Sequence, residues 1–440
     1  MKFYDRENEL AELKRIQDLS FTDHSRLTVI TGRRRIGKTS LVMRAVENSP
    51  TIYLFVSRKN EASLCAEYIP LIAQALGVYV PEEIKTFRSL FQYLLEQAKV
   101  KAFNLVIDEF QEFYNINPSV YSDMQNLWDR YRMDTRMNLI VSGSVYSLMQ
   151  KIFRNSKEPL FGRADNIIKL PAFSIATLKE IIHDYSPDYT PDDLLALYSF
   201  TGGVPKYVEL FCDNRILDVE GMISFMIRDN SPFIDEGKYL LIEEFGKNYA
   251  TYFSILSAIS GGVNTQSTIE AALGEKSIGG QLKRLMEDYN VITRRRPILA
   301  KEGSQTIRYE ITDNFLRFWF NYFDRHRSLM EIKNYPGLQQ IVKSDYPTYS
   351  GHLLELYFKQ QMAETFQYRD IGSWWELKDG QNEIDIVALK LEKNKAVAIE
   401  VKRQKKNFKP ELLRQKVEHL KKKVLPRYEI EMKCLSLEDM

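Results

Sequence analysis

The fold is decided by Leu27-Thr-Val-Ile-Thr31 and the residues directly after it, Gly32-Arg-Arg-Arg-Ile-Gly-Lys-Thr39. The first run is short and rich in β-branched residues, which predicts a buried strand. Apolar residues at helical spacing follow from Ser40 to Val46. A strand, a G-x-x-x-x-G-K-T loop and a helix in this order predict a phosphate-binding loop. The glycines let backbone N–H groups face phosphates, and the helix N-terminus adds partial positive charge.

The loop predicts binding of ATP with Mg²⁺, and we expect hydrolysis. Lys38 would reach the β- and γ-phosphates, and the hydroxyl of Thr39 would ligate Mg²⁺. A glycine turn that binds nothing is the alternative, but the spacing and the flanking elements argue against it. The expected nucleotide contacts are Gly32, Arg33, Arg34, Arg35, Ile36, Gly37, Lys38, Thr39 and Ser40.

A second apolar run, Asn104–Glu109, ends in two acids. Such a run suits a central parallel strand, whose carboxyl end faces the ligand crevice. We expect Asp108 to contact Mg²⁺, directly or through water, and Glu109 to orient or activate the attacking water. The alternative is that Glu109 only faces solvent.

A third run, Asn138–Ser144, ends in Ser-Gly-Ser. Ser142 or Ser144 could hydrogen-bond the γ-phosphate or the water, or the serines could only form a turn. Arg163 follows a loop that contains glycine and could act as an arginine finger, in its own chain or in a neighbour's. The second case requires a homo-oligomer, and a surface arginine is the simpler alternative.

Together these motifs resemble the archaeal-type P-loop ATPases of the AAA+/STAND group. The resemblance implies an ATPase core over residues 1–170 and a helical lid over residues 171–235. It also implies that Tyr4–Glu9 lies near the adenine, that Arg163 senses the γ-phosphate, and that Thr201–Pro205 belongs to the lid beside the nucleotide. Besides the loop it rests on Tyr4–Leu10, Asp108–Gln111, Pro159–Arg163 and Thr201–Pro205.

Residues 236–330 have the pattern of a winged helix-turn-helix followed by a hinge. The expected order is three helices and a two-stranded hairpin, over residues 252–259, 265–273, 277–288, 291–296 and 307–311. Lys276 and Lys283 on the third helix, and Arg294–Arg296 on the first strand, could contact DNA phosphates. The alternative is a domain that packs between the others or contacts a protein partner. The hinge, Tyr309–Phe320, resembles the same ATPase family.

The last part, residues 331–440, carries a pattern of acids and one lysine. Glu355 lies on an amphipathic helix, Asp385 on an alternating strand, and Glu400 and Lys402 on one face of a further strand. If they converge, three carboxylates would bind Mg²⁺, and the lysine would stabilise negative charge on a phosphodiester.

This order resembles the PD-(D/E)xK, or restriction-endonuclease-like, fold. The resemblance makes Asp385 and Glu400 metal ligands, Glu355 an accessory ligand, and Lys402 the catalytic base or charge stabiliser. The expected fold class is therefore α/β: a P-loop parallel sheet with a helical lid, a winged helix, and an α/β nuclease-like domain. Alternatively, Glu400 and Lys402 form a charged strand edge, and the domain binds without cutting.

Composition limits the choice of partners. Hydrophobic residues make up 44% of the 440 residues and the net charge is +2, so no overall field marks a nucleic-acid binder. Eleven basic and two acidic residues lie between Lys402 and Arg427, and this stretch could meet DNA phosphates or form a solvated helix face. No apolar run approaches the length of a membrane span, and the three cysteines lack metal or disulfide spacing. We therefore expect a cytoplasmic protein.

Overall fold

The computed structural model describes residues 1–246, 249–275, 277–301, 307–376 and 382–440. The chain forms two compact units. One is Asp5–Pro171, and the other combines Met1–Tyr4 with Ala172–Met440. The first unit ends one residue after the expected limit of the ATPase core. The further boundaries expected at residues 235 and 330 stay predictions.

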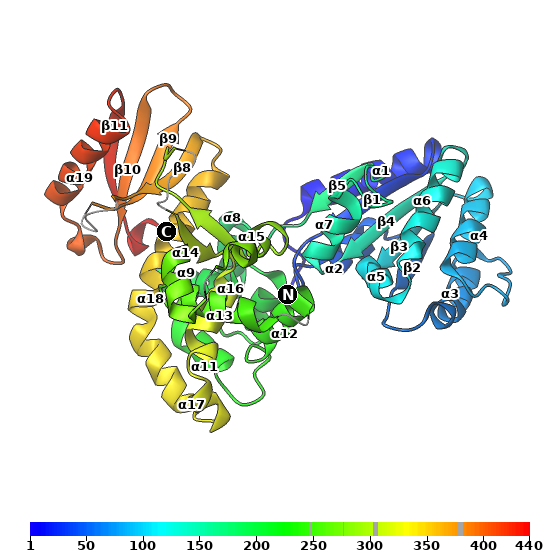
Figure 1. The fold of residues 1–440 in the computed structure, drawn as a ribbon, viewed down its shortest axis with the longest axis horizontal. Helices are drawn as coiled ribbons and strands as arrows, with labels where there is room; N and C mark the ends of the chain where they lie inside the picture. Colours follow the sequence, from blue (N-terminus) through cyan, green and yellow to red (C-terminus); the bar gives the residue numbers. More distant parts are fainter. Residues whose placement is uncertain (247–248, 276, 302–306, 377–381) are drawn as a thin grey trace. The chain divides into compact units, whose positions relative to one another are not determined.

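A parallel five-stranded sheet organises the unit Asp5–Pro171, in the order β2-β3-β4-β1-β5 (Figure 1). Strands β3 and β4 are buried along their whole length, as expected for strands with helices on both faces. Since β4 lies between β1 and β3, its carboxyl end lies between the phosphate-binding loop and the two acids. The strands are β1 (Arg26–Thr31), β2 (Thr51–Phe55), β3 (Phe103–Asp108), β4 (Met137–Gly143) and β5 (Asn166–Lys169).

Helices pack a continuous apolar core against this sheet, with Phe91, Phe110 and Trp128 fully buried. The longer helices are amphipathic, and side chains of Asn60 and Thr86 cap the start of two of them. The helices are α1 (Glu7–Thr22), α2 (Lys38–Ala45), α3 (Glu61–Leu76), α4 (Phe87–Val100), α5 (Phe113–Ile116), α6 (Ser119–Tyr131) and α7 (Tyr146–Arg154).

The second unit begins with the helices expected to form the lid. Its core is aromatic, and Tyr207 and Phe211 both pack on Phe233. Helix α9 starts with a capping box between Thr190 and Asp193. The helices are α8 (Ile175–Tyr185), α9 (Pro191–Thr201), α10 (Pro205–Asp213), α11 (Val219–Met226) and α12 (Glu236–Phe245).

Three helices and an antiparallel hairpin follow, in the order that the sequence predicts. They are α13 (Tyr249–Ser260), α14 (Gln266–Leu273), α15 (Gly279–Glu287), β6 (Ile292–Arg295) and β7 (Arg308–Ile311). The guanidinium of Arg295 is paired with Glu310 and its side chain is only 16% exposed, which counts against a DNA contact by this residue, but the contact stays a prediction. Lys276 lies outside the described residues, whereas Lys283 and Arg294 are exposed.

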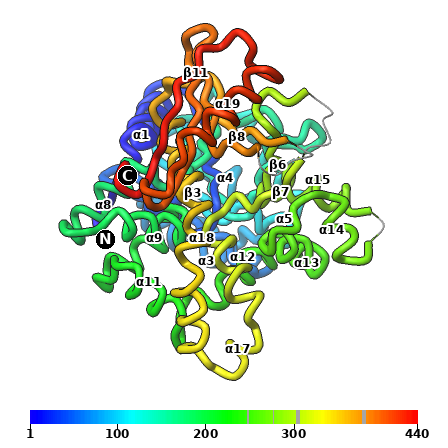
Figure 2. Tube along the Cα trace, turned by 90° about the vertical axis from the view of Figure 1, so that its left-hand side faces the viewer, coloured from blue at the N-terminus to red at the C-terminus, as the bar shows by residue number. Residues whose placement is uncertain are grey.

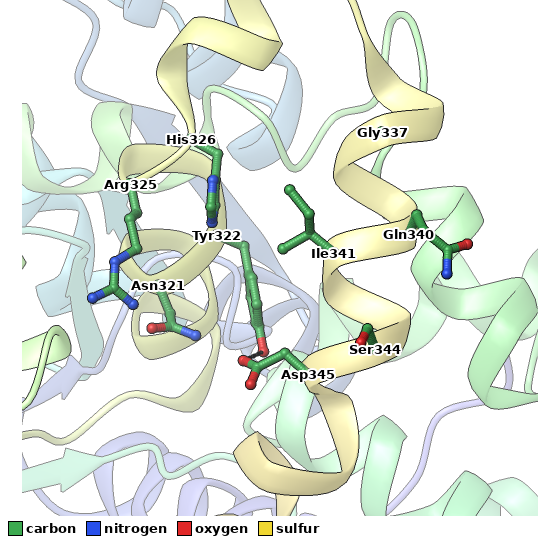
Figure 3. Close-up of a pocket in the computed structure, with 9 residues that line it drawn as sticks. All are labelled: Asn321, Tyr322, Arg325, His326, Gly337, Gln340, Ile341, Ser344 and Asp345. Atoms are coloured by element: carbon green, nitrogen blue, oxygen red, sulfur yellow. Dashed lines mark hydrogen bonds between the residues drawn. The ribbon is translucent and has the colours of Figure 1, made fainter.

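A short helical segment leads to α18 (Tyr335–Glu364), which spans 30 residues. The segment comprises α16 (Asn314–Phe318), a π-helical turn (Trp319–Asp324) and α17 (Arg327–Glu331). An open groove of about 800 Å³ lies between this turn and the first half of α18 (Figure 3). Tyr322 crosses it and donates a hydrogen bond to Asp345 at 2.7 Å.

The chain then enters a mixed four-stranded sheet, in the order β11-β10-β9-β8. Strands β8, β9 and β10 pair antiparallel, and β10 pairs parallel with β11. The chain trace passes from α17 through α18 to these strands (Figure 2). Their bounds, with the last long helix, are β8 (Tyr368–Trp374), β9 (Ile384–Lys390), β10 (Lys395–Val401), α19 (Pro410–Lys423) and β11 (Glu429–Leu435). Among the described residues, no helix is long and apolar enough to cross a membrane.

Candidate functional sites

The phosphate-binding loop joins β1 to α2 as predicted. Gly37 has a φ of 89°, which favours glycine, and a Cβ on Gly32 would lie 3.0 Å from the carbonyl oxygen of Leu170. Lys38 is buried, and its Nζ donates to the carbonyl oxygens of Gly32 at 2.9 Å and Arg33 at 3.0 Å. The loop thus holds its ammonium group at the N-terminus of α2, where an anion would be stabilised.

Asp108 ends β3 and accepts hydrogen bonds from four neutral donors. Thr39 Oγ1 and Tyr53 Oη each donate to Oδ2 at 2.8 Å. Ser142 Oγ donates to Oδ1 at 2.5 Å, and the backbone N–H of Glu109 donates to it at 3.0 Å. A carboxylate has about four lone-pair sites, so all of them are engaged. Asp108 therefore fits a role behind Thr39 or a water rather than direct contact with Mg²⁺.

Tyr53 is the member of this group that sequence reasoning missed. Burial first, and the hydrogen bond to Asp108 second, raise the pKa of its phenol well above the ordinary value. The phenol thus stays protonated and remains a donor. A tyrosine in a β-branched and aromatic strand otherwise predicts only core packing.

Glu109 lies next to this group and is held by two side chains. Ser144 Oγ donates to its Oε2 at 2.7 Å, and Gln111 Nε2 donates to the same atom at 2.5 Å. Its backbone has a φ of 54°, a left-handed conformation that is uncommon for a residue with a Cβ. The carboxylate is thus fixed at the carboxyl end of the sheet and is not a freely solvated side chain.

Arg163 lies near the amino ends of the strands, opposite the end of the sheet that carries the phosphate-binding loop. Its guanidinium pairs with Asp129 at 3.1 Å, near the end of α6 and before β4 begins. The nearby Asp165 N–H bonds the carbonyl oxygen of Leu27, at the amino end of β1. Because the loop follows the carboxyl end of β1, Arg163 is not beside the phosphate-binding loop of its own chain. An arginine finger is consistent with this position only if it acts on a neighbouring chain.

Of the two segments implied to lie near the nucleotide, Tyr4–Glu9 is divided between the units after Tyr4, and Thr201–Pro205 belongs to the second unit. Tyr4 donates a hydrogen bond to Asp184 of α8 at 2.7 Å, and Thr201–Pro205 joins α9 to α10. Their expected place beside the adenine and the phosphates stays a prediction.

The acids and the lysine of the C-terminal domain converge. Lys402 Nζ lies 2.9 Å from Glu400 Oε1 and 3.8 Å from Asp385 Oδ2. Asp385 Oδ2 also accepts the backbone N–H of Val401 at 2.7 Å. Burial first, and then the charges of Glu355 and Glu400, raise the pKa of Asp385 to about 7. Asp385, Glu400 and Lys402 thus lie together where β9 begins and β10 ends, and Asp385 also feels the charge of Glu355.

Lys416 is a further cation in this cluster that sequence reasoning missed. It lies on the buried face of α19, and its Nζ contacts both carboxylate oxygens of Glu400, at 3.1 and 3.2 Å. Lys402 and Lys416 therefore share one carboxylate. Within the basic stretch, its helical spacing from Leu413 and Leu420 was the available signal.

Glu355 and Lys359 bring α18 into the same cluster. Their charged groups are 3.9 Å apart, and His352 lies 3.7 Å from Glu355. Burial raises the pKa of Glu355, but His352, Lys359 and Arg295 outweigh it and bring it below the ordinary value. Burial first, and then Arg295, lower the pKa of Lys359 to about 8.

Ser373 connects the hairpin to this cluster. Its hydroxyl accepts hydrogen bonds from Arg295 Nη2 at 2.6 Å and Lys359 Nζ at 2.7 Å, and donates to the carbonyl oxygen of Asp385 at 2.8 Å. Arg308 of β7 pairs with Glu383 at 3.2 Å. The hairpin is therefore bound to the strand that carries Asp385.

The cluster suits a divalent cation in its donors but not in its present pairing. Asp385, Glu400 and Glu355 supply carboxylate oxygens, which Mg²⁺ prefers. Among the described residues, however, no group of three or more His, Cys, Asp or Glu side chains is arranged to hold a metal ion. Lys402 lies between Asp385 and Glu400, so an ion shared by these two acids would have to displace it.

Comparison with known proteins agrees with the class that the first site defines. The parallel sheet, the loop and Asp108 make Asp5–Pro171 a P-loop ATPase domain, and a model described as an ATPase domain predominantly from Archaea matches residues 3–211. A model described as Archaea bacterial proteins of unknown function matches residues 319–419.

A relative places the whole chain in a family. This chain is 30% identical over 418 residues to the uncharacterized protein MJECL04 of Methanocaldococcus jannaschii. The alignment covers 91% of this chain and 87% of that protein. The chain therefore belongs to the same family as that protein and carries its ATPase domain in the archaeal-type class.

Two solved structures align with the chain at lower identity. The Walker-type ATPase PABY2304 of Pyrococcus abyssi aligns with a TM-score of 0.54 at 18% identity, over 72% of this chain and 96% of that chain. Cdc6p of Pyrobaculum aerophilum aligns with a TM-score of 0.36 at 14% identity, over 77% and 95% of the two chains. Only the first likeness is close enough to support the fold.

Proposed function

We propose that this chain is a Mg²⁺-dependent ATP-hydrolysing switch whose C-terminal domain cleaves the phosphodiester backbone of DNA. The observation that carries the proposal is the convergence of Glu355, Asp385, Glu400 and Lys402, which come from one helix and two strands. Asp385 and Glu400 carry like charges side by side, and Lys402 and Lys416 offset part of their repulsion; a divalent cation would offset it further.

The ATPase step uses the first site. Lys38 binds the phosphates, Thr39 would hold Mg²⁺ with Asp108 behind it, and Glu109 orients the attacking water. ATP would order the lid, and hydrolysis would release it, as in other γ-phosphate switches.

The cleavage step uses the second site. Asp385 and Glu400 would hold the metal with Glu355 nearby, and the metal would supply Lewis acidity and an activated water. Lys402 is placed to stabilise negative charge on the phosphate once it leaves Glu400, while Lys416 keeps Glu400 in place. Exposed cations near α19, Lys405, Lys406, Lys409 and Lys422, would bind the backbone by charge.

The ATPase is tested by thermal unfolding and turnover. Mg²⁺-ATP should raise the melting temperature of wild type but not of Lys38→Ala, since the variant lacks the cation that faces the phosphates. Glu109→Gln should keep the shift and lose turnover about 100-fold or more. No shift with wild type would refute ATP binding.

Cleavage is tested by nicking of plasmid DNA with Mg²⁺ or Mn²⁺, with and without ATP. Wild type should nick, and Asp385→Asn and Lys402→Ala should not, although both stay folded. Arg414→Ala removes a cation from the exposed face of α19, where Arg414 pairs with Glu411, and should still nick. Intact DNA under all these conditions would refute cleavage.

A second function is favoured by the pairing of Lys402 and Lys416 with Glu400. These lysines could neutralise the acids permanently and leave a domain that binds DNA or a partner without cutting. The winged-helix-like domain would then be the main contact. Salt-dependent DNA binding without nicking, together with no binding of Mn²⁺, would support this alternative.

A further inference from the structure

Helix α18 is shared by the lid helices and the C-terminal site. Its first half contacts the lid, where Tyr346 Oη donates to Asp192 at 3.0 Å and Gln339 Nε2 donates to the carbonyl oxygen of Ile227 at 2.7 Å. Its second half carries Glu355 and Lys359. The helix is about 45 Å long at 1.5 Å per residue, so it reaches both regions as one element.

A second connection starts one residue after the predicted catalytic lysine. Arg403 Nη2 lies 2.7 Å from Asp192 Oδ2, and its Nη1 donates to Ser350 of α18. The guanidinium also lies 5.3 Å from the centre of the Tyr346 ring. Because the group is planar and forked, its two Nη atoms reach the two partners in fixed directions, a geometry that the single nitrogen of a lysine does not reproduce.

The partner of Arg403 lies at the start of a lid helix. Asp192 is in the first turn of α9, and the far end of α9 leads into Thr201–Pro205. A displacement of that end would be carried along α9 to Asp192, because a helix of 11 residues moves as a unit.

The backbone beside Arg403 forms part of the C-terminal site. The N–H of Val401 donates to Asp385 at 2.7 Å, and the N–H of Lys402 donates to the carbonyl oxygen of Leu435 at 2.9 Å. A shift of Arg403 would therefore act on the position of Asp385 and on the direction of the Lys402 side chain.

We propose that Arg403 is a positioning residue that couples the lid to the C-terminal site. Movement of α9 reaches β10 through the pair of Asp192 and Arg403 and changes how Lys402 is held. The proposal rests on the proposed function in one respect, that ATP moves the lid. It does not require that the domain cleaves DNA.

Hydrogen exchange in the full chain tests the coupling directly. The Glu109→Gln background keeps ATP bound, and exchange of the Val401 and Lys402 amides is compared with and without Mg²⁺-ATP. We expect ATP to change these rates about tenfold, within the range of allosteric coupling. Added Arg403→Lys or Asp192→Asn should reduce the change to less than about twofold. The response should persist with Arg414→Lys, which changes an arginine outside this connection.

The outcomes separate the coupling from cleavage. ATP affinity and melting temperature show whether each variant is folded and binds nucleotide. An unchanged response in Arg403→Lys and Asp192→Asn would overturn the coupling, as would a flat response in the Glu109→Gln protein while ATP is bound. A normal response in a protein that never nicks DNA would support the coupling and refute only the cleavage.

Discussion

Asp108 is a buried aspartate and Asp385 a partly buried one, both near strand ends, but their surroundings differ in kind. Asp108 accepts four hydrogen bonds from hydroxyl groups and a backbone N–H. Asp385 accepts one backbone N–H, lies 3.8 Å from a lysine, and feels the charges of Glu355 and Glu400. The first carboxylate is stabilised by its own fold. The second has fewer partners within the fold, so an added cation or a proton would stabilise it further.

The largest effect is expected from Asp108→Asn. An amide accepts on one side only, so two of the four donors lose their partner, and the negative charge behind Thr39 is gone. ATP turnover should fall about 100-fold, or ~2.7 kcal/mol in the barrier. Steady-state phosphate release measures this, and the free energy of unfolding should also decrease. Turnover close to wild type would show that Asp108 does not support the metal.

The same substitution at the other aspartate should have the opposite effect on stability. The pKa of Asp385 is raised to about 7, above its ordinary value of 3.8. Between these values the folded chain binds more protons than the unfolded chain, so stability falls as pH rises from about 4 to 7. In EDTA at pH 8, Asp385→Asn should therefore raise the free energy of unfolding by about 2 kcal/mol.

Urea unfolding at several pH values checks this difference. The gain from Asp385→Asn should shrink toward zero below about pH 3, because wild type is then mostly protonated at this position in both states. A loss of stability at pH 8 would mean that Lys402 and the N–H of Val401 already stabilise the ionised form of Asp385.

Tyr53→Phe should have a smaller effect. It removes one of the four donors to Asp108 and leaves the ring, a change of about 1 kcal/mol. We expect the Mg²⁺ concentration for half-maximal hydrolysis to rise about fivefold, with the ATP affinity nearly unchanged. Equal loss of ATP affinity would indicate a general packing defect.

The smallest effect is expected from Arg163→Ala, near the amino ends of the strands of the same sheet. Its exposed pair with Asp129 should contribute less than about 0.5 kcal/mol to stability. Hydrolysis by a monomer should not change. If hydrolysis falls and mixing with Lys38→Ala protein restores it, Arg163 acts on a neighbouring chain.

The sequence predicted the residues whose position follows from local pattern. Gly32–Thr39, Asp108 and Asp385 come directly after or within strands whose apolar runs are readable. For Gly32–Thr39 and Asp108, the carboxyl ends of parallel strands also meet at one end of the sheet. The roles of Tyr53 and Arg163 depend instead on which strands are neighbours. Strand order is set by packing between distant segments, and no local pattern contains it.

Arg295, on the hairpin, is a second residue whose surroundings could not be predicted from a local pattern. Three consecutive arginines suggested a phosphate contact, but alternation along β6 turns only the middle one toward Glu310 and Ser373. A run of like charges in a strand thus divides between two faces. Arg295 is paired and partly buried, Arg296 is also partly buried, and Arg294 is the exposed member of the run.

The division of the chain between the two units has one further consequence. Residues 1–4 belong with Ala172–Met440, so the polypeptide passes between the units twice, after Tyr4 and after Pro171. Arg6 Nη2 donates to the carbonyl oxygen of Pro171 at 2.6 Å and so fastens the two crossings to each other. The ATPase is thus an insertion whose ends lie together. The hydrogen bond lies inside the unit Asp5–Pro171 and joins residues near its two ends, so the domain is closed at the place where the chain enters and leaves it.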